Sequence, residues 1–176
     1  MTNNFQPIPK PVAAGACFAL LAIFLGFALG VAFGAKESAI KDHLNESGTT
    51  VLESVYHGDV DAKKAVVSKS WSYLKRSHMH GSAIGTSALV AILALLAFGA
   101  RGGIANFSAL AFGLGAVIYS LFWLFAGLSA PAIGSTGAAK ESLAFLALPG
   151  AGLSMLGLCG TLFSVAKASF FAPSKP

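Results

Sequence analysis

Charged residues are scarce in this sequence, and its longest apolar stretches contain none. Asp, Glu, Lys and Arg make up only 11% of the 176 residues, whereas 55% are hydrophobic. That balance exceeds what the core and surface of a soluble domain require. Because the apolar stretches carry no charge between their ends, they lack the ion pairs and proton relays on which pumps and coupled transporters depend. The composition therefore predicts a membrane protein and argues against secondary transport.

Cysteine and clustered positive charge are also lacking. The two cysteines, Cys17 and Cys159, lie inside apolar runs, so the chain has no disulfide framework, and we expect both to be small packing residues. The net charge of +5 comes largely from basic residues interspersed with acids, whereas nucleic-acid binding requires clustered charge that neutralises phosphates. We therefore expect no nucleic-acid partner and interpret the basic excess as a signal for membrane orientation.

Four apolar segments are long enough to cross a bilayer, which takes about 20 helical residues. They lie at 12–35, 78–100, 104–130 and 142–166. An extended, proline-rich tail is expected at 1–11 and a short basic tail at 167–176. The first segment also resembles a signal peptide, with Ala32-Phe33-Gly34 as a loose cleavage site. It is longer than the roughly 7 to 15 residues of a signal core, so we expect it to be retained as a span.

Glycine and proline positions predict how these spans pack and end. Gly26, Gly30 and Gly34 recur at four-residue spacing, which leaves one helix face bare for close approach by a neighbouring backbone. Pro131 and the loop after it are expected to end the third span, and Pro149 to kink the fourth. Further glycines in the apolar runs are expected to be helix contacts rather than phosphate loops, namely Gly113, Gly115, Gly157 and Gly160.

Residues 36–77 form the one long polar segment, with six of the seven acidic and seven of the twelve basic residues. Its apolar residues recur at helical spacing, which predicts amphipathic helices. Turn signals interrupt the pattern at Ser47-Gly48-Thr49 and at His57-Gly58-Asp59, and Asp59 is expected to cap the helix that follows. The predicted fold is an all-α membrane protein, a four transmembrane helix bundle with a helical polar insertion between spans 1 and 2.

The junction between the polar segment and the second span, Trp71 to Gly85, holds two of the four histidines. The favoured interpretation is structural, because Trp, Tyr, Lys, Arg and His side chains are typical of a headgroup interface, with an apolar body in lipid and a polar tip in water. The junction would then join a surface helix to the second span.

Cofactor binding at this junction is the alternative. On a continuous helix, His78 shares a face with Gly81 and Gly85, so a haem b macrocycle could lie beside the imidazole. No other span contains a histidine for the second axial position. A transition metal held by His78 and His80, with His57 from the polar segment, would require the helix to begin after His80, because residues two apart face opposite ways on a helix.

An aromatic set in the third span gives a further alternative, a flat slot for a quinone or lipid tail. Such residues are more often packing or interface anchors. The set comprises Tyr119, Phe122, Trp123 and Phe125.

The function expected from the sequence is that of a non-enzymatic integral membrane subunit or accessory protein, which acts by helix association and through its polar domain. Its partners would be the lipid bilayer and other membrane subunits or further copies of the chain. Four spans put both termini on one side, and that side carries Lys and Arg but no acid. We expect a bacterial inner membrane or its equivalent, with cytoplasmic termini and residues 36–77 on the opposite side.

Overall fold

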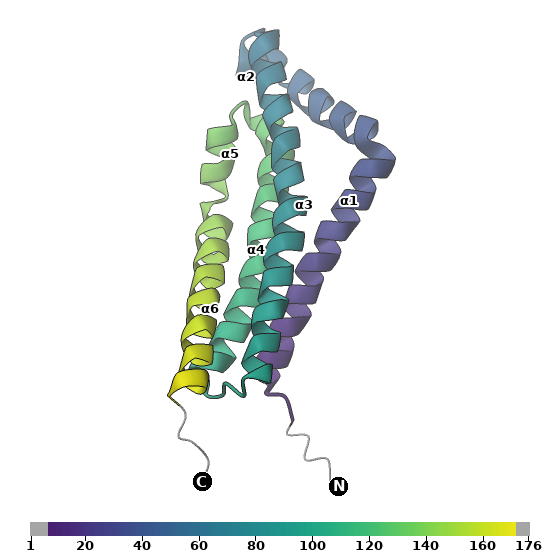
Figure 1. Cartoon of the computed structure of the whole chain (residues 1–176). Helices are drawn as coiled ribbons and strands as arrows, with labels where there is room; N and C mark the ends of the chain where they lie inside the picture. The colour runs from purple at the N-terminus through teal and green to yellow at the C-terminus, as the bar shows by residue number, and fades with distance from the viewer. Residues whose placement is uncertain (1–6, 172–176) are drawn as a thin grey trace, which may run out of the picture.

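The structure, a computed structural model, describes residues 7–171, which are helical apart from short connections and contain no strand. The parts of the predicted tails at 1–6 and 172–176 lie outside the described residues. The helices are α1 (Lys10–Thr50), α2 (Leu52–Tyr56), α3 (Val60–Ala97), α4 (Gly103–Ile133), α5 (Thr136–Ser142) and α6 (Ala144–Phe170) (Figure 1). The predicted all-helical architecture is confirmed, and α1, α3, α4 and α6 are each long and apolar enough to cross a membrane.

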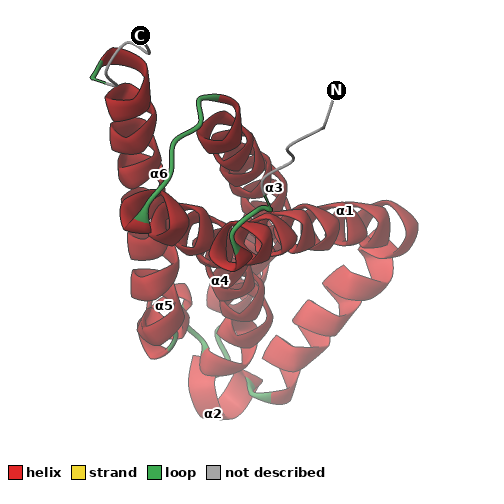
Figure 2. Cartoon of the chain, turned by 90° about the horizontal axis from the view of Figure 1, so that it is seen from below, coloured by secondary structure: helices red, strands yellow, loops and turns green. Residues whose placement is uncertain are grey.

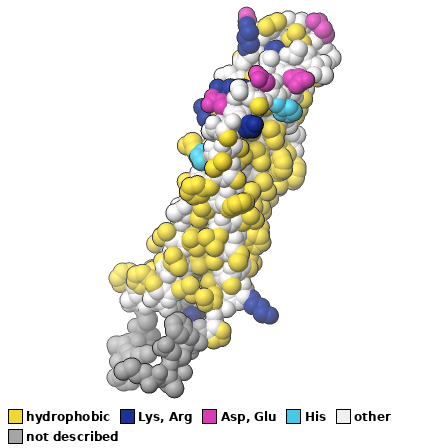
Figure 3. Space-filling view, turned by 90° about the vertical axis from the view of Figure 1, so that its right-hand side faces the viewer, with side chains coloured by type: hydrophobic (Ala, Val, Ile, Leu, Met, Phe, Trp, Pro, Cys, Tyr) yellow, Lys and Arg dark blue, Asp and Glu magenta, His cyan; other side chains and the backbone are white. Residues whose placement is uncertain are grey.

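Helix α4 is the centre of the bundle, since it packs against α1, α3 and α6 (Figure 2). In its most apolar stretch 56% of the residues are buried, compared with 17% in α6. The loop between α3 and α4 lies at the same end as the start of α1 and the end of α6, and α2 lies at the other end (Figure 1). On the face shown in Figure 3, an apolar band lies between these ends, with basic and acidic side chains gathered above it and basic ones below it.

Helix α1 changes direction at Lys36, whose backbone angles (φ −139°, ψ 26°) are not helical. The bend falls where the sequence turns from apolar to polar. Beyond it, the second half of α1 leans back toward α3 and α2 (Figure 1). Its contact with α3 is made at Gly48, where an added Cβ would lie 3.0 Å from the Lys63 side chain. The Lys63 ammonium donates a hydrogen bond to the Thr49 hydroxyl at 2.8 Å.

This contact explains why the turn predicted at Ser47-Gly48-Thr49 is wrong. Helix α1 continues through Gly48 to Thr50, because the glycine admits α3 and tertiary packing outweighs its weak helix propensity. The second predicted break is confirmed. His57 and Gly58 have positive φ angles of 53° and 77°, and the Asp59 carboxylate accepts hydrogen bonds from the backbone amides of Asp61 and Ala62.

The prediction for the end of the third span is confirmed for the loop and wrong for Pro131. Helix α4 passes Pro131 and ends at Ile133, and Gly134, the first residue of the predicted loop, takes the left-handed conformation (φ 78°). A proline in the last turn removes only one hydrogen bond, so the helix tolerates it. Helix α6 continues through Pro149, where the kink stays a prediction, and the chain breaks earlier, at Leu143 between α5 and α6. Cys17 and Cys159 are exposed rather than packed.

Glycines bring the helix backbones together, as predicted for most positions. A Cβ on Gly113 of α4 would overlap the Gly15 carbonyl of α1, and a Cβ on Gly115 would lie 2.6 Å from the Ser154 amide nitrogen of α6. On α1, Gly26 and Gly30 face α3, whereas Gly34 has nothing within 4 Å. The glycine contacts of the first half of α1 therefore stop before the bend at Lys36.

Candidate functional site

The candidate site is the junction Trp71 to Gly85, which the structure builds as one uninterrupted part of α3. Because α3 begins at Val60, the histidines lie in the middle of a helix rather than in an extended segment. His78 and His80 consequently face different neighbours: His78 lies against α1, and His80 lies against α4.

His78 joins α3 to α1. Its ring nitrogen Nδ1 lies 2.6 Å from the Gly26 carbonyl oxygen, and because a carbonyl only accepts, Nδ1 carries the proton. The ring lies over Gly30, where an added Cβ would be 2.8 Å from the imidazole Cε1, and Phe33 approaches it edge-on with centroids 6.1 Å apart. Gly30 therefore makes room for the imidazole, whereas Gly26 makes room for Ser82 and the α3 backbone.

Gly81 and Gly85 do lie on one face of α3, as the sequence predicts, but that face is covered by α1. An added Cβ would lie 2.9 Å from the Ala22 carbonyl oxygen at Gly81 and 2.9 Å from the Ala19 carbonyl oxygen at Gly85. The space expected for a macrocycle holds a helix backbone, so the structure gives no support to haem at His78.

The three histidines proposed as metal ligands are not brought together. His78 and His80 face opposite sides of α3, and His57 lies exposed in the turn between α2 and α3. Within residues 7–171, no group of three His, Cys, Asp or Glu side chains is placed to hold a metal ion. The structure therefore gives no support to a metal site at this junction.

The α4 side of the junction is an aromatic and cationic cluster, here defined as Tyr73, Arg76 and His80 of α3 with Tyr119 and Trp123 of α4. The Arg76 guanidinium lies 4.8 Å from the Trp123 ring centroid, and the His80 ring lies 5.2 Å from that of Tyr119. An arginine over an indole face contributes about 0.5 to 1 kcal/mol at an exposed position. The cluster anchors α3 to α4 where the polar segment meets the apolar band.

The quinone slot predicted in α4 is occupied by the aromatic rings themselves. Tyr119 and Phe122 stack at 5.9 Å and 27°, and Trp123 packs edge-on against Tyr73 at 4.9 Å. The rings therefore pack on one another. Phe125, the fourth member of the predicted set, is 43% exposed.

A serine pair next to this cluster escaped the sequence analysis. The Ser77 hydroxyl donates to the Ser120 carbonyl oxygen at 2.8 Å, and the Ser120 hydroxyl donates to the Ser77 carbonyl oxygen at 2.9 Å. Both residues are buried. Serines are too common for either position to stand out, and the pairing depends on the register of α3 against α4.

These contacts make the junction a meeting point of α1, α3 and α4, with interhelical hydrogen bonds on both sides of α3. Comparison with known protein families, with characterised proteins and with solved structures gives no match for this chain. The functional argument therefore depends on the surfaces that this assembly leaves open.

Proposed function

We propose that the chain is a multi-pass membrane protein that acts as a non-enzymatic subunit or accessory protein through helix association. Membrane residence is supported by the exposure of large apolar side chains on α1 and α6. Phe24 is 66% exposed, Leu148 75% and Leu162 71%. Soluble monomeric proteins rarely expose an apolar surface of this size to water. The bacterial inner membrane and cytoplasmic termini are part of this proposal.

The observation that carries the association proposal is a groove between α3 and α6, floored by α4. Two adjoining cavities of about 450 Å³ each run along it and share Ser87 of α3 and Leu158 of α6. Small residues of α3 line the groove at four-residue spacing, namely Ala83, Ser87 and Ala91. Small residues at this spacing allow another helix backbone to approach closely.

The groove wall also contains a buried hydroxyl without a hydrogen-bond partner among residues 7–171. Thr161 of α6 lines the groove and is 6% exposed, and its hydroxyl has no hydrogen-bond partner among residues 7–171. Buried polar groups normally have a partner, more so in an apolar surrounding. Because this oxygen is enclosed by the chain itself, a partner in the groove does not reach it, and the small residues of α3 are what favour a helix there. Residues 36–77 form the polar segment and offer a second surface for contact with a partner.

Extraction in a mild detergent followed by affinity purification and mass measurement tests this function. Wild type is expected to elute with a second polypeptide at fixed stoichiometry, either another subunit or a second copy. Ser87→Phe, which fills the groove from an exposed position, is expected to release the monomer. The matched control Leu20→Phe enlarges a residue on the exposed face of α1 and is expected to leave the complex intact. Wild type that elutes only as a free monomer would refute association.

A further inference from the structure

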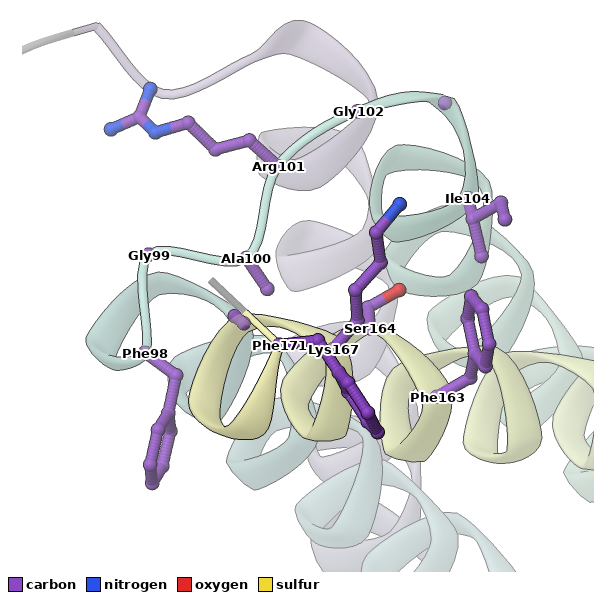
Figure 4. Close-up of a pocket in the computed structure, with 12 residues that line it drawn as sticks. Phe98, Gly99, Ala100, Arg101, Gly102, Ile104, Phe163, Ser164, Lys167 and Phe171 are labelled. Atoms are coloured by element: carbon purple, nitrogen blue, oxygen red, sulfur yellow. The ribbon is translucent and has the colours of Figure 1, made fainter. Parts of the chain in front are cut away.

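The bundle has a further cavity, at the end where α1 begins. The proposed function does not involve this cavity. The loop between α3 and α4 and the last two turns of α6 enclose about 510 Å³ (Figure 4), within the range of small-molecule sites. Its lining is divided by chemistry. Arg101, Lys167 and Ser164 are polar, and the larger apolar residues are Phe98, Ile104, Phe163 and Phe171.

Within residues 7–171, no acidic side chain pairs with the positive charge at this cavity. Among the described residues the ion pairs are Lys41 with Glu37 and Lys64 with Asp61, all in the polar segment. Arg101 and Lys167 have no acidic neighbour near them in the sequence. The Lys167 side chain extends from α6 toward the loop, and Arg101 lies on the loop with its guanidinium pointing outward (Figure 4).

Ser164 adds a buried donor. It is only 8% exposed and lines the cavity. The Ser108 and Ser154 hydroxyls donate to the carbonyls four residues earlier on their own helices. The Ser164 hydroxyl, in contrast, makes no hydrogen bond with another residue of the described range, and it lies near the Lys167 side chain (Figure 4). Helix α4 also begins at the cavity without a side-chain cap on Gly102, so its first amides add partial positive charge.

We propose that this cavity binds an anionic phospholipid from the leaflet on that side. The phosphate would accept hydrogen bonds from Lys167 and Ser164, with Arg101 at the rim, and an acyl chain would lie along the exposed phenylalanines. Basic pockets between membrane helices bind the head groups of anionic lipids in this way. The apolar lining selects a lipid over a free anion, because inorganic phosphate has nothing to place against Phe98, Phe163 and Phe171. This proposal rests on the membrane residence proposed above.

Native mass spectrometry of the detergent-extracted protein tests the site. Phosphatidylglycerol and phosphatidylcholine of equal chain length are added in turn, and inorganic phosphate serves as competitor. Wild type is expected to retain phosphatidylglycerol about tenfold more than phosphatidylcholine, because the choline ammonium of the latter is repelled by Lys167 and Arg101. Lys167→Gln is expected to lose most of this preference.

Lys10→Gln is the matched control, because it removes the same charge at the same end of the bundle but outside the cavity. It is expected to retain the wild-type preference, and all variants should melt at the wild-type temperature. Equal retention of the two lipids, or an equal loss in Lys10→Gln and Lys167→Gln, would overturn the lipid site. Displacement by inorganic phosphate at the same concentration as the lipid would show a free-anion site and overturn it as well. A chain that stays in solution without detergent would instead overturn membrane residence.

Discussion

His78 acts at the scale of a single residue as a polar bridge between two apolar helices. Its Nδ1 proton is donated to the Gly26 carbonyl, and its ring fills the space left by Gly30. Interhelical hydrogen bonds of this kind contribute about 0.6 kcal/mol on average in membranes and up to about 1.7 kcal/mol. The imidazole ring also packs against α1, so the hydrogen bond and this packing both depend on the His78 side chain.

The variant His78→Ala is therefore expected to lower the free energy of unfolding by about 1 to 2 kcal/mol, since the hydrogen bond is lost and a void remains. Denaturation in mixed detergent micelles measures this change. Met79→Ala is the control, because Met79 is 60% exposed and its truncation should change stability little. Equal effects of the two variants would contradict the bridging role. An absorbance spectrum of the reduced wild type tests the haem hypothesis separately, because bound haem would give a Soret band.

The sequence could specify part of this residue-scale arrangement. Helical spacing placed His78, Gly81 and Gly85 on one face, and the structure has them on one face. What the spacing could not specify was the neighbour that covers the face, because glycine admits a ring, a cofactor or a backbone equally. The pairing of Ser77 with Ser120 was out of reach for the same reason, since it depends on how α3 lies against α4.

At the scale of the element, glycine contacts set the distances between helices. Gly113 of α4 meets Gly15 of α1 at the backbone, whereas Gly152 of α6 has nothing within 4 Å. The two positions form a natural pair for substitution, since both are helical glycines in apolar surroundings and only one is enclosed.

Gly113→Ala is expected to lower the free energy of unfolding by about 1 to 3 kcal/mol, the usual cost of overpacking. Gly152→Ala is expected to be neutral or stabilising by up to about 1 kcal/mol, because alanine favours the helix and meets no neighbour. Unfolding in mixed micelles compares the two. If both variants lost stability equally, the α1–α4 contact would not be the cause.

Helix α2 is attached to the end of α4 by one buried hydrogen bond, in which the Tyr56 phenol donates to the Pro131 carbonyl at 2.7 Å. Burial raises the pKa of Tyr56 above its ordinary value. Only the protonated phenol donates, so this contribution to stability is complete below about pH 10, the ordinary tyrosine pKa. It is lost as the pH rises through the raised pKa.

Tyr56→Phe is expected to lower stability by about 1 kcal/mol at pH 8, the net contribution of a buried hydrogen bond. The difference from wild type should shrink or reverse well above pH 10. Unfolding of both proteins at the two pH values measures it, and trypsin cleavage after Lys63 or Lys64 reports loosening of the adjacent segment. A difference that stays constant with pH would show that the phenolic proton plays no part.

The elements themselves were largely readable from the sequence, because a helix that faces lipid must be long and uncharged. The helix ends were less so. Gly48 and Pro131 look like breaks, yet one admits Lys63 and the other lies in a last turn that loses a single hydrogen bond. In contrast, the break at His57 and Gly58 was evident from the sequence, because a glycine is followed directly by an aspartate that can cap a helix, and the positive φ angles confirm it.

At the scale of the whole molecule, the charge distribution distinguishes the two ends. One end of the bundle, where α1 begins and α6 finishes, carries basic residues and no acidic ones. The opposite end carries all seven acidic residues. A proposed anionic lipid at the first end and a polar segment at the second fit a fixed orientation in the membrane. Orientation is the property that neither the helix packing nor the length of the spans determines.

Cysteine labelling in intact cells determines the orientation. On a background of Cys17→Ser and Cys159→Ser, Glu53→Cys places a thiol in the polar segment, and Ile8→Cys places one before α1, both at exposed positions. With cytoplasmic termini, a membrane-impermeant maleimide is expected to label Glu53→Cys in intact cells, and Ile8→Cys only after permeabilisation. The reverse pattern would keep four spans and invert the protein, so the proposed lipid would lie in the outer leaflet. Labelling of both thiols without permeabilisation would mean that the polar segment and the N-terminus share one side, which an odd number of spans between them cannot produce.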